Sequence, residues 1–183
     1  MVTVEEAFSI TEYVDSEDCI REHGMARNRP FCLERRWAVS SLALENIGRM
    51  PPSSIGCSLE VFDLRSTGLI NILPKLGINR DREVEYLSLY ASHEEYIAGI
   101  LAQEKPFCVG RVKRVNIWGY AASVITKMTI HEDNTMESFV LSGNDEGKLS
   151  RILEEGDNSI DLGRIRTGGL QVPERIKRKL RYT

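Results

Sequence analysis

The chain has few cysteines, and none of them are close neighbours. Its 183 residues include only Cys19, Cys32, Cys57 and Cys108, without a C-x-x-C pair. This spacing disfavours a zinc site or a redox dithiol and does not support a disulfide framework. We therefore expect reduced thiols in a cytosolic or nuclear protein.

Long apolar runs are also missing. No stretch approaches 18 uninterrupted apolar residues, the length that a membrane-spanning helix requires. No apolar run follows a positive patch near the N-terminus, as it would in a signal peptide. We expect a protein that is not secreted and whose contact with membranes is peripheral.

The usual catalytic motifs are absent as well. There is no G-x-S-x-G motif, no phosphate loop and no dinucleotide fingerprint. His93 and His131 each precede acidic residues, but no spacing supplies the further ligands of a metal or acid–base site. A capped helix start and a solvated turn explain them. The sequence predicts no cofactor, no metal and no enzymatic activity, and a small enzyme with an unrecognised site is the weakest alternative.

The sequence does have two ends of opposite charge. The first eighteen residues contain six acidic side chains and no basic one. The last twenty residues are rich in Lys and Arg. We predict that seven basic residues bind polyanions or a nuclear import receptor, although a solvated helix face would explain the same run. They are Arg164, Arg166, Arg175, Lys177, Arg178, Lys179 and Arg181.

This charge distribution divides the chain into three parts. We expect a flexible acidic N-terminal arm over 1–30, an α+β globular domain over 31–163 and a basic C-terminal tail over 164–183. The acidic arm also carries isolated apolar side chains. These are predicted to dock on a neighbouring copy, so that the complementary ends associate head to tail into a homo-oligomer. They are Phe8, Ile10, Tyr13 and Val14.

The secondary-structure signals favour an antiparallel sheet. Apolar and polar residues alternate over 118–131, which predicts a long central strand. Strands predicted over 107–117 and 136–141 flank it, and three consecutive strands imply an antiparallel meander. The remaining signals predict further strands at 33–44, 55–61 and 159–162, and short helices at 69–76, 96–101, 149–153 and after Pro173. The segment 83–91 is ambiguous, and no internal repeat is apparent.

One basic segment weakly resembles a base-stacking platform. Residues 111–114 are rich in Lys and Arg and lead to Trp118 and Tyr120. Platforms for single-stranded nucleic acid interleave such residues on one exposed face. Core packing beside a solvated basic edge explains the pattern equally well.

Two segments resemble rhabdovirus matrix proteins. Residues 128–137 read MTIHEDNTME, and matrix proteins have a Met-Thr-Ile strand end followed by acidic residues, Ser or Thr, an aliphatic residue and Glu. Gly119 and Tyr120 fit loosely, and residues 72–77 resemble an Ile-Leu-x-x-Leu-Gly segment of the same family. Length and the basic tail bring the chain closest to plant, nucleus-replicating rhabdoviruses of the dichorhavirus type. Unlike animal-virus relatives, it has an acidic arm and no Pro-Pro-x-Tyr signal.

The resemblance implies a structural α+β protein of the virion. Such a protein would self-associate, condense the viral nucleocapsid and bridge it to the anionic membrane surface of the envelope. It would occur in the host nucleus or at the cytoplasmic face of host membranes, and it would bind nucleic acid only non-specifically. The alternative from another class is a small nucleic-acid-binding or silencing-type regulatory protein that uses the same basic tail.

Overall fold

The computed structural model describes residues 2–4, 8–12, 20–24, 31–34, 41–57, 61–65, 68–78, 83–143 and 145–183. Near the N-terminus, β1 (Val2–Val4) comes first and pairs with a strand further along the chain. The next two strands, β2 (Phe8–Glu12) and β3 (Ile20–Gly24), pair with each other in antiparallel fashion. Of the predicted self-association residues, Phe8 and Ile10 lie in β2, whereas Tyr13 and Val14 lie outside the described residues. Head-to-tail association therefore stays a prediction.

From residue 31 onward, the described residues repeat one unit six times: a strand, a helix and a return strand. The first coil consists of β4 (Phe31–Glu34), α1 (Ser41–Arg49) and β5 (Ile55–Cys57). The second consists of β6 (Val61–Arg65), the 3-10 helix η1 (Gly68–Lys75) and β7 (Leu76–Ile78). The third consists of β8 (Glu83–Ala91), the helices η2 (Glu94–Ile97) and α2 (Ala98–Leu101), and β9 (Phe107–Cys108).

The last three coils follow the same plan. They are β10 (Arg111–Gly119), η3 (Tyr120–Lys127) and β11 (Met128–Thr129); β13 (Ser138–Ser142), α3 (Glu146–Glu154) and β14 (Ile160–Ile165); and β15 (Leu170–Gln171), α4 (Glu174–Lys177) and β16 (Leu180–Tyr182). The two-residue strand β12 (Thr135–Met136) precedes β13.

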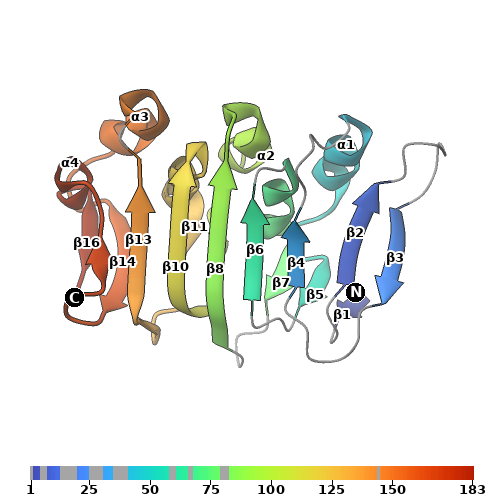
Figure 1. Ribbon diagram of the computed structural model, residues 1–183, viewed down its shortest axis with the longest axis horizontal. Helices are drawn as coiled ribbons and strands as arrows, with labels where there is room; N and C mark the ends of the chain where they lie inside the picture. Colours follow the sequence, from blue (N-terminus) through green and yellow to red (C-terminus); the bar gives the residue numbers. More distant parts are fainter. Residues whose placement is uncertain are drawn as a thin grey trace.

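The coils stack into a solenoid. Their first strands form the main sheet, in the order β15-β13-β10-β8-β6-β4, and every neighbouring pair is parallel. The return strands form three parallel back sheets, β1-β5-β7, β9-β11 and β12-β14-β16. In Figure 1 the main-sheet strands lie side by side, the helices lie at their carboxyl ends, and the two termini lie at opposite ends. Strands are parallel because each coil winds the chain in the same direction.

The predicted antiparallel meander is therefore wrong. Neighbouring main-sheet strands are separated by 24 to 31 residues, as the pairs Arg114 with Ser138 and Phe139 with Leu170 show. A crossover of this length contains a helix and a return strand, which parallel pairing requires. The basic C-terminal residues belong to the solenoid, because β15, α4 and β16 form its last coil. The chain has an internal repeat, which the sequence did not show plainly.

The long central strand predicted over 118–131 is wrong for a local reason. Gly119 ends β10 with φ +68° and ψ −147°, and the chain then enters the 3-10 helix η3 before the short β11. Ala121, Ala122, Val124 and Ile125 are all nearly inaccessible. A strand would have exposed half of this run, whereas a helix with three residues per turn buries it on one side. The ambiguous segment 83–91 is the strand β8.

Register rows that run from coil to coil fill the core. One row joins Phe62, Leu87, Val115 and Phe139, and the next joins Leu64, Leu89, Ile117 and Leu141. The helices of five coils each contribute at least one fully buried aliphatic residue to the core, among them Ile72, Ile100, Val124, Ile152 and Ile176. Each such side chain contributes about 1.5–3 kcal/mol on burial, so the stack depends on contacts between neighbouring coils.

Candidate functional site

The outward side of the main sheet carries a group of aromatic and polar side chains. Leu87 and Leu89 point into the core, so the alternating residues of β8 point outward. The same alternation applies to β6 and β10. We call the resulting surface the aromatic face; it consists of Asp63, Tyr86, Ser88, Tyr90, Asn116 and Trp118.

The aromatic residues of this face contact one another across the strands. Tyr90 lies opposite Trp118 in the register, and their rings stack with centroids 5.9 Å apart and planes 29° apart. Tyr86 accepts a hydrogen bond from Asn116 Nδ2 at 3.3 Å. All four side chains are half-buried. They therefore form a fixed surface that still reaches the solvent.

Ser88 lies at the centre of the aromatic face. Its register neighbours are Asp63 and Asn116, and its neighbours along the same face are Tyr86 and Tyr90. These larger residues leave Ser88 fully buried, and within the described part of the chain its hydroxyl has no hydrogen-bond partner. Buried hydroxyl groups are normally satisfied, so an unpaired one needs an explanation.

A cluster of charges lies at the amino ends of β8 and β10. Lys113 Nζ lies 3.1 Å from Glu83 and also forms an ion pair with Glu85, and Arg114 lies 3.8 Å from Glu85. The hydrogen bonds that Lys113 donates to Glu85 and, with a smaller effect, to Glu83 raise the pKa of its ammonium group above the ordinary value. By the same alternation Glu83, Glu85 and Lys113 lie on the side of the sheet that carries Leu87 and Val115, whereas Arg114 lies on the side of the aromatic face.

The predicted base-stacking segment does not form one platform. Trp118 lies on the aromatic face, but Tyr120 follows the turn at Gly119 and lies under Lys148 Nζ, 5.7 Å from its ring centroid. Lys113 and Arg114 are paired with glutamates. The sequence pattern therefore singled out Trp118 and missed Tyr86 and Tyr90. Their position between the buried leucines of β8 was the available signal.

The seven predicted polyanion-binding residues lie in the last two coils and each has an acceptor nearby. Arg166 lies 3.5 Å from Glu137, and the five residues of the last coil all lie within ion-pair distance of a carboxylate: Arg175 with Glu146, Lys177 with Glu174, Arg178 and Lys179 with Asp157, and Arg181 with Asp161. The guanidinium group of Arg164 lies 3.5 Å from the carbonyl oxygen of Glu132.

These pairs reduce the positive character that the sequence suggested. Residues 131–183 contain ten acidic and nine basic side chains. Lys179 is largely buried and donates a hydrogen bond of 2.5 Å to the carbonyl oxygen of Glu155. Arg181 lowers the pKa of Asp161, with a smaller contribution from the Gly163 amide. A polyanion at this site would compete with carboxylates that already contact the same cations.

The histidines of the described segments lie apart. His93 Nδ1 lies 2.9 Å from Ser92 Oγ, and its ring meets Tyr96 edge-on, whereas His131 lies 3.9 Å from Asp133. Within the described residues, no group of three or more His, Cys, Asp or Glu side chains could hold a metal ion. In the same part of the chain, no helix has the length and apolar character needed to cross a membrane.

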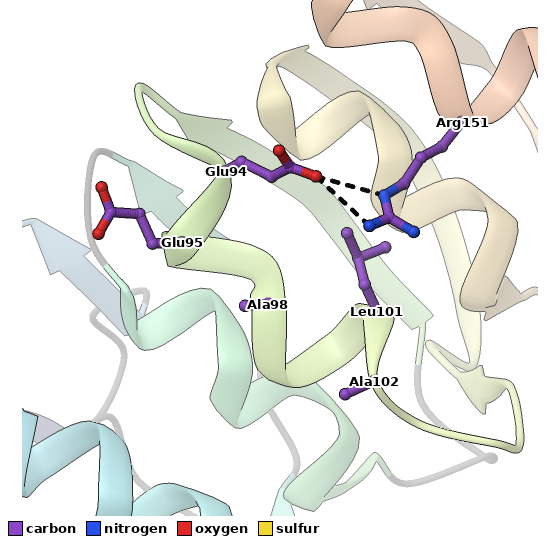
Figure 2. Close-up of a pocket in the computed structure, with 6 residues that line it drawn as sticks. All are labelled: Glu94, Glu95, Ala98, Leu101, Ala102 and Arg151. Carbon is purple, nitrogen blue, oxygen red and sulfur yellow. Dashed lines mark hydrogen bonds and ion pairs between the residues drawn. The ribbon is translucent and has the colours of Figure 1, made fainter.

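A shallow hollow of about 530 Å³ lies between α2 and α3. Figure 2 shows Glu94 and Arg151 facing each other across it, joined by contacts of 3.4 Å, while Glu95 points away. Ala98, Leu101 and Ala102 line the remaining wall. The ion pair ties the helices of two coils together, and the hollow contains neither a nucleophile nor a histidine.

Comparisons with protein-family models, with curated proteins and with solved structures find no match for this chain. Functional inference therefore rests on the geometry of the aromatic face and of the coils that support it.

Proposed function

We propose that this protein is a non-enzymatic binding scaffold that docks a partner protein on the aromatic face. The observation that carries this proposal is the arrangement of Tyr86, Tyr90 and Trp118. They lie half-exposed and adjacent on two neighbouring strands, around a buried and unpaired Ser88 hydroxyl.

The chemistry of the face supports a protein as the occupant. Tyr and Trp combine a large apolar area with a polar group, and they dominate the binding energy at protein interfaces. Asp63, Arg114 and Asn116 supply polar and charged groups beside the rings, as the rims of such interfaces do. Solenoids typically bind through an extended surface of this type.

Photo-crosslinking from two sides of the solenoid tests the proposal. A benzophenone amino acid replaces Ser142, which is exposed in the Tyr90–Trp118 register row, or Thr129, which is exposed on the back strand β11. Each of the two variants is added to an extract of cells that naturally contain this protein, and the mixture is irradiated. We expect a discrete, protease-sensitive adduct from position 142 and none from position 129.

Variants of the face decide whether the adduct depends on it. Tyr90→Ser and Trp118→Ser should reduce the yield from position 142 at least tenfold, because interface aromatics contribute about 2 kcal/mol or more. The matched control is Tyr182→Ser, a half-buried tyrosine on the back strand β16, which should leave the yield unchanged. Equal adducts from both sides, or an adduct that survives Trp118→Ser, would contradict the proposal. A nuclease-sensitive adduct would identify nucleic acid instead.

The viral matrix function stays a prediction. The segment 128–137 that resembles matrix proteins forms β11, a turn and β12 rather than the end of a long strand. Co-sedimentation with anionic liposomes and with RNA at physiological salt tests this function separately. Sedimentation with liposomes in preference to RNA, lost on replacing Lys177 and Arg178 by Ala, would support it.

A further inference from the structure

The back of the solenoid is interrupted between the second and third coils. β7 is the last strand of the sheet β1-β5-β7, and β9 is the first strand of the pair β9-β11. Elsewhere, β5 pairs with β7, β9 with β11 and β14 with β16, and the fourth coil reaches the fifth through β12, which pairs with β14 in place of β11. Two strand edges therefore face each other here without a described strand between them.

A five-residue connection between helix and return strand borders this interruption, and it is as long as the connections of the first and fifth coils. In the second and fourth coils, the helix runs directly into its return strand: η1 ends at Lys75 before β7, and η3 ends at Lys127 before β11. In the third coil, five residues separate α2 from β9. Lys127 Nζ donates a hydrogen bond of 2.7 Å to the Gln103 carbonyl and fixes this loop.

A groove of about 760 Å³ occupies the interruption. All three residues of β7 and both residues of β9 line it, together with the loop 103–106. At one end the coils come into contact, since a Cβ atom built on Gly110 would lie 3.1 Å from Ile78 Cγ2. The groove is therefore a bounded slot between two strand edges. It lies on the back strands, apart from the aromatic face.

The two edges define the shape of an occupant. A strand edge presents main-chain N–H and C=O groups that an extended polypeptide can pair with, and alternate side chains of the added strand enter pockets beside it. Pro74, Leu76 and Phe107 give the groove apolar walls. A strand added between β7 and β9 would continue the back sheet from the second coil to the third.

The charge of the groove defines the chemistry of the occupant. Lys75 lies in the wall, and its Nζ donates to the carbonyl oxygens of Met50 at 2.7 Å and Gly48 at 3.4 Å, not to a carboxylate. Lys105 is exposed, and no described carboxylate lies within ion-pair distance of it. Glu104 is the one acidic residue among those that line the groove. The excess of positive charge favours an acidic segment.

We propose that the groove between β7 and β9 binds an acidic, extended segment of a partner polypeptide by strand addition. This inference does not depend on the aromatic face, and either surface can function without the other. Cys108 provides a direct assay, because its thiol is exposed in the wall of the groove.

The test uses heptapeptide libraries that carry an N-terminal chloroacetyl group. In the acidic library, Asp or Glu alternates with Val, Ile, Thr or Tyr; the basic library has Lys in place of the acids; a third is acidic but N-methylated at alternate residues. The Cys108 sulfur displaces chloride and forms a thioether, which peptide mapping by mass spectrometry locates. Each rate is divided by that of plain chloroacetamide. We expect acidic peptides to label Cys108 about fivefold faster than basic ones and about tenfold faster than N-methylated ones.

Charge reversal supplies the matched control. Lys105→Glu should abolish the preference for acidic peptides, and Lys105→Gln should give an intermediate ratio. Lys177→Glu changes an exposed lysine on α4, away from the groove, and should leave the ratio unchanged. Equal labelling by the three libraries, no labelling above chloroacetamide, or an unchanged ratio in Lys105→Glu would overturn the proposal. Labelling that declines as protein concentration rises would do so too, because a second copy would then occupy the groove.

Discussion

Two buried asparagines connect neighbouring segments of the solenoid. Asn71 donates to the carbonyl oxygens of Gly68 and Tyr96, both at 2.9 Å, and accepts from the amide of Ile100 at 3.0 Å. Asn134 accepts from the amide of Val112 at 3.0 Å and donates to the same residue's carbonyl oxygen at 2.9 Å. Asn134 pairs with the main chain of β10 as a neighbouring strand would, whereas Asn71 joins η1 to η2 and α2.

We expect Asn134→Ala to lower the free energy of unfolding by about 3 kcal/mol. The substitution leaves a buried amide and a buried carbonyl of Val112 unpaired, and each unsatisfied group costs about 1–3 kcal/mol. Asn116→Ala is the control, because Asn116 is half-buried and makes one bond of 3.3 Å. Urea denaturation followed by circular dichroism measures both. Equal losses in the two variants would contradict this account of Asn134.

The pair of Asp161 and Arg181 makes stability depend on acid pH. The Arg181 hydrogen bond, followed by the Gly163 amide, lowers the pKa of Asp161 in the folded state. The ionised carboxylate therefore stabilises the fold above the ordinary pKa of about 3.9. This contribution is lost as pH falls through the lower, folded-state value.

Asp161→Asn should destabilise the protein at pH 7 and have little effect at pH 2. Because both side chains are more than half exposed, the loss at pH 7 is expected to be about 0.5 kcal/mol. Arg181→Gln should cause a similar loss, and the double variant should lose less than the two single losses combined. Denaturation midpoints across pH 2–7 measure this. A difference from wild type that grows toward acid pH would refute it.

At the scale of the elements, Gly119 determines where β10 ends. Its φ of +68° is a conformation that side chains disfavour, and a Cβ atom there would lie 2.4 Å from the carbonyl oxygen of Ala91. Gly163 has the same φ of +68°, but a Cβ atom there would meet nothing within 4 Å. The two glycines thus separate the cost of backbone strain from the cost of a steric clash.

Gly119→Ala should cost clearly more stability than Gly163→Ala. The positive φ alone costs about 1–2 kcal/mol, which is the expected loss for Gly163→Ala. Gly119→Ala should lose about 3 kcal/mol or more, because the Ala91 backbone must also move. Denaturant midpoints of the two variants provide the comparison. Equal losses would show that the clash relaxes without cost and that strain alone acts.

Several elements could be predicted from local sequence, but their pairing could not. Helices near 96–101 and 149–153 and the helix after Pro173 are present as α2, α3 and α4. Within 118–131, however, the apolar residues fit both the two-residue period of a strand and the three-residue period of a 3-10 helix. The sequence alone did not show that the strand ends at Gly119. The order of the strands depends on non-local contacts between coils about 24–31 residues apart, and local signals do not contain this information.

The candidate site was predicted less well than the elements. Trp118 was noticed because it follows a basic segment, yet its partner Tyr90 comes from the preceding coil. Only the parallel register brings these two rings together, and the meander would have separated them. The basic residues 175–181 stood out in sequence because their carboxylate partners lie elsewhere in the chain, as Arg175 with Glu146 shows.

At the scale of the whole molecule, stability should vary along the stack. A solenoid coil contacts chiefly its neighbours, so its stability is a sum of local terms. A central coil such as that of β8 contacts two neighbours in the main sheet, on β6 and β10, whereas the last coil contacts its one preceding neighbour. The last coil can therefore open while the central coils remain folded.

Two buried leucines test this expectation, one in a central coil and one in the last coil. Leu89 is in the central strand β8, and Leu180 is in the terminal strand β16. Either Leu→Ala change should lower the free energy of unfolding by about 2–4 kcal/mol. By hydrogen exchange with mass spectrometry, Leu180→Ala should lose protection over 170–183 alone, since the terminal coil opens separately. Leu89→Ala should lose protection throughout 83–143, because β8 supports coils on both sides. If both variants show the same uniform loss, the stack unfolds as one cooperative unit and the nearest-neighbour description fails.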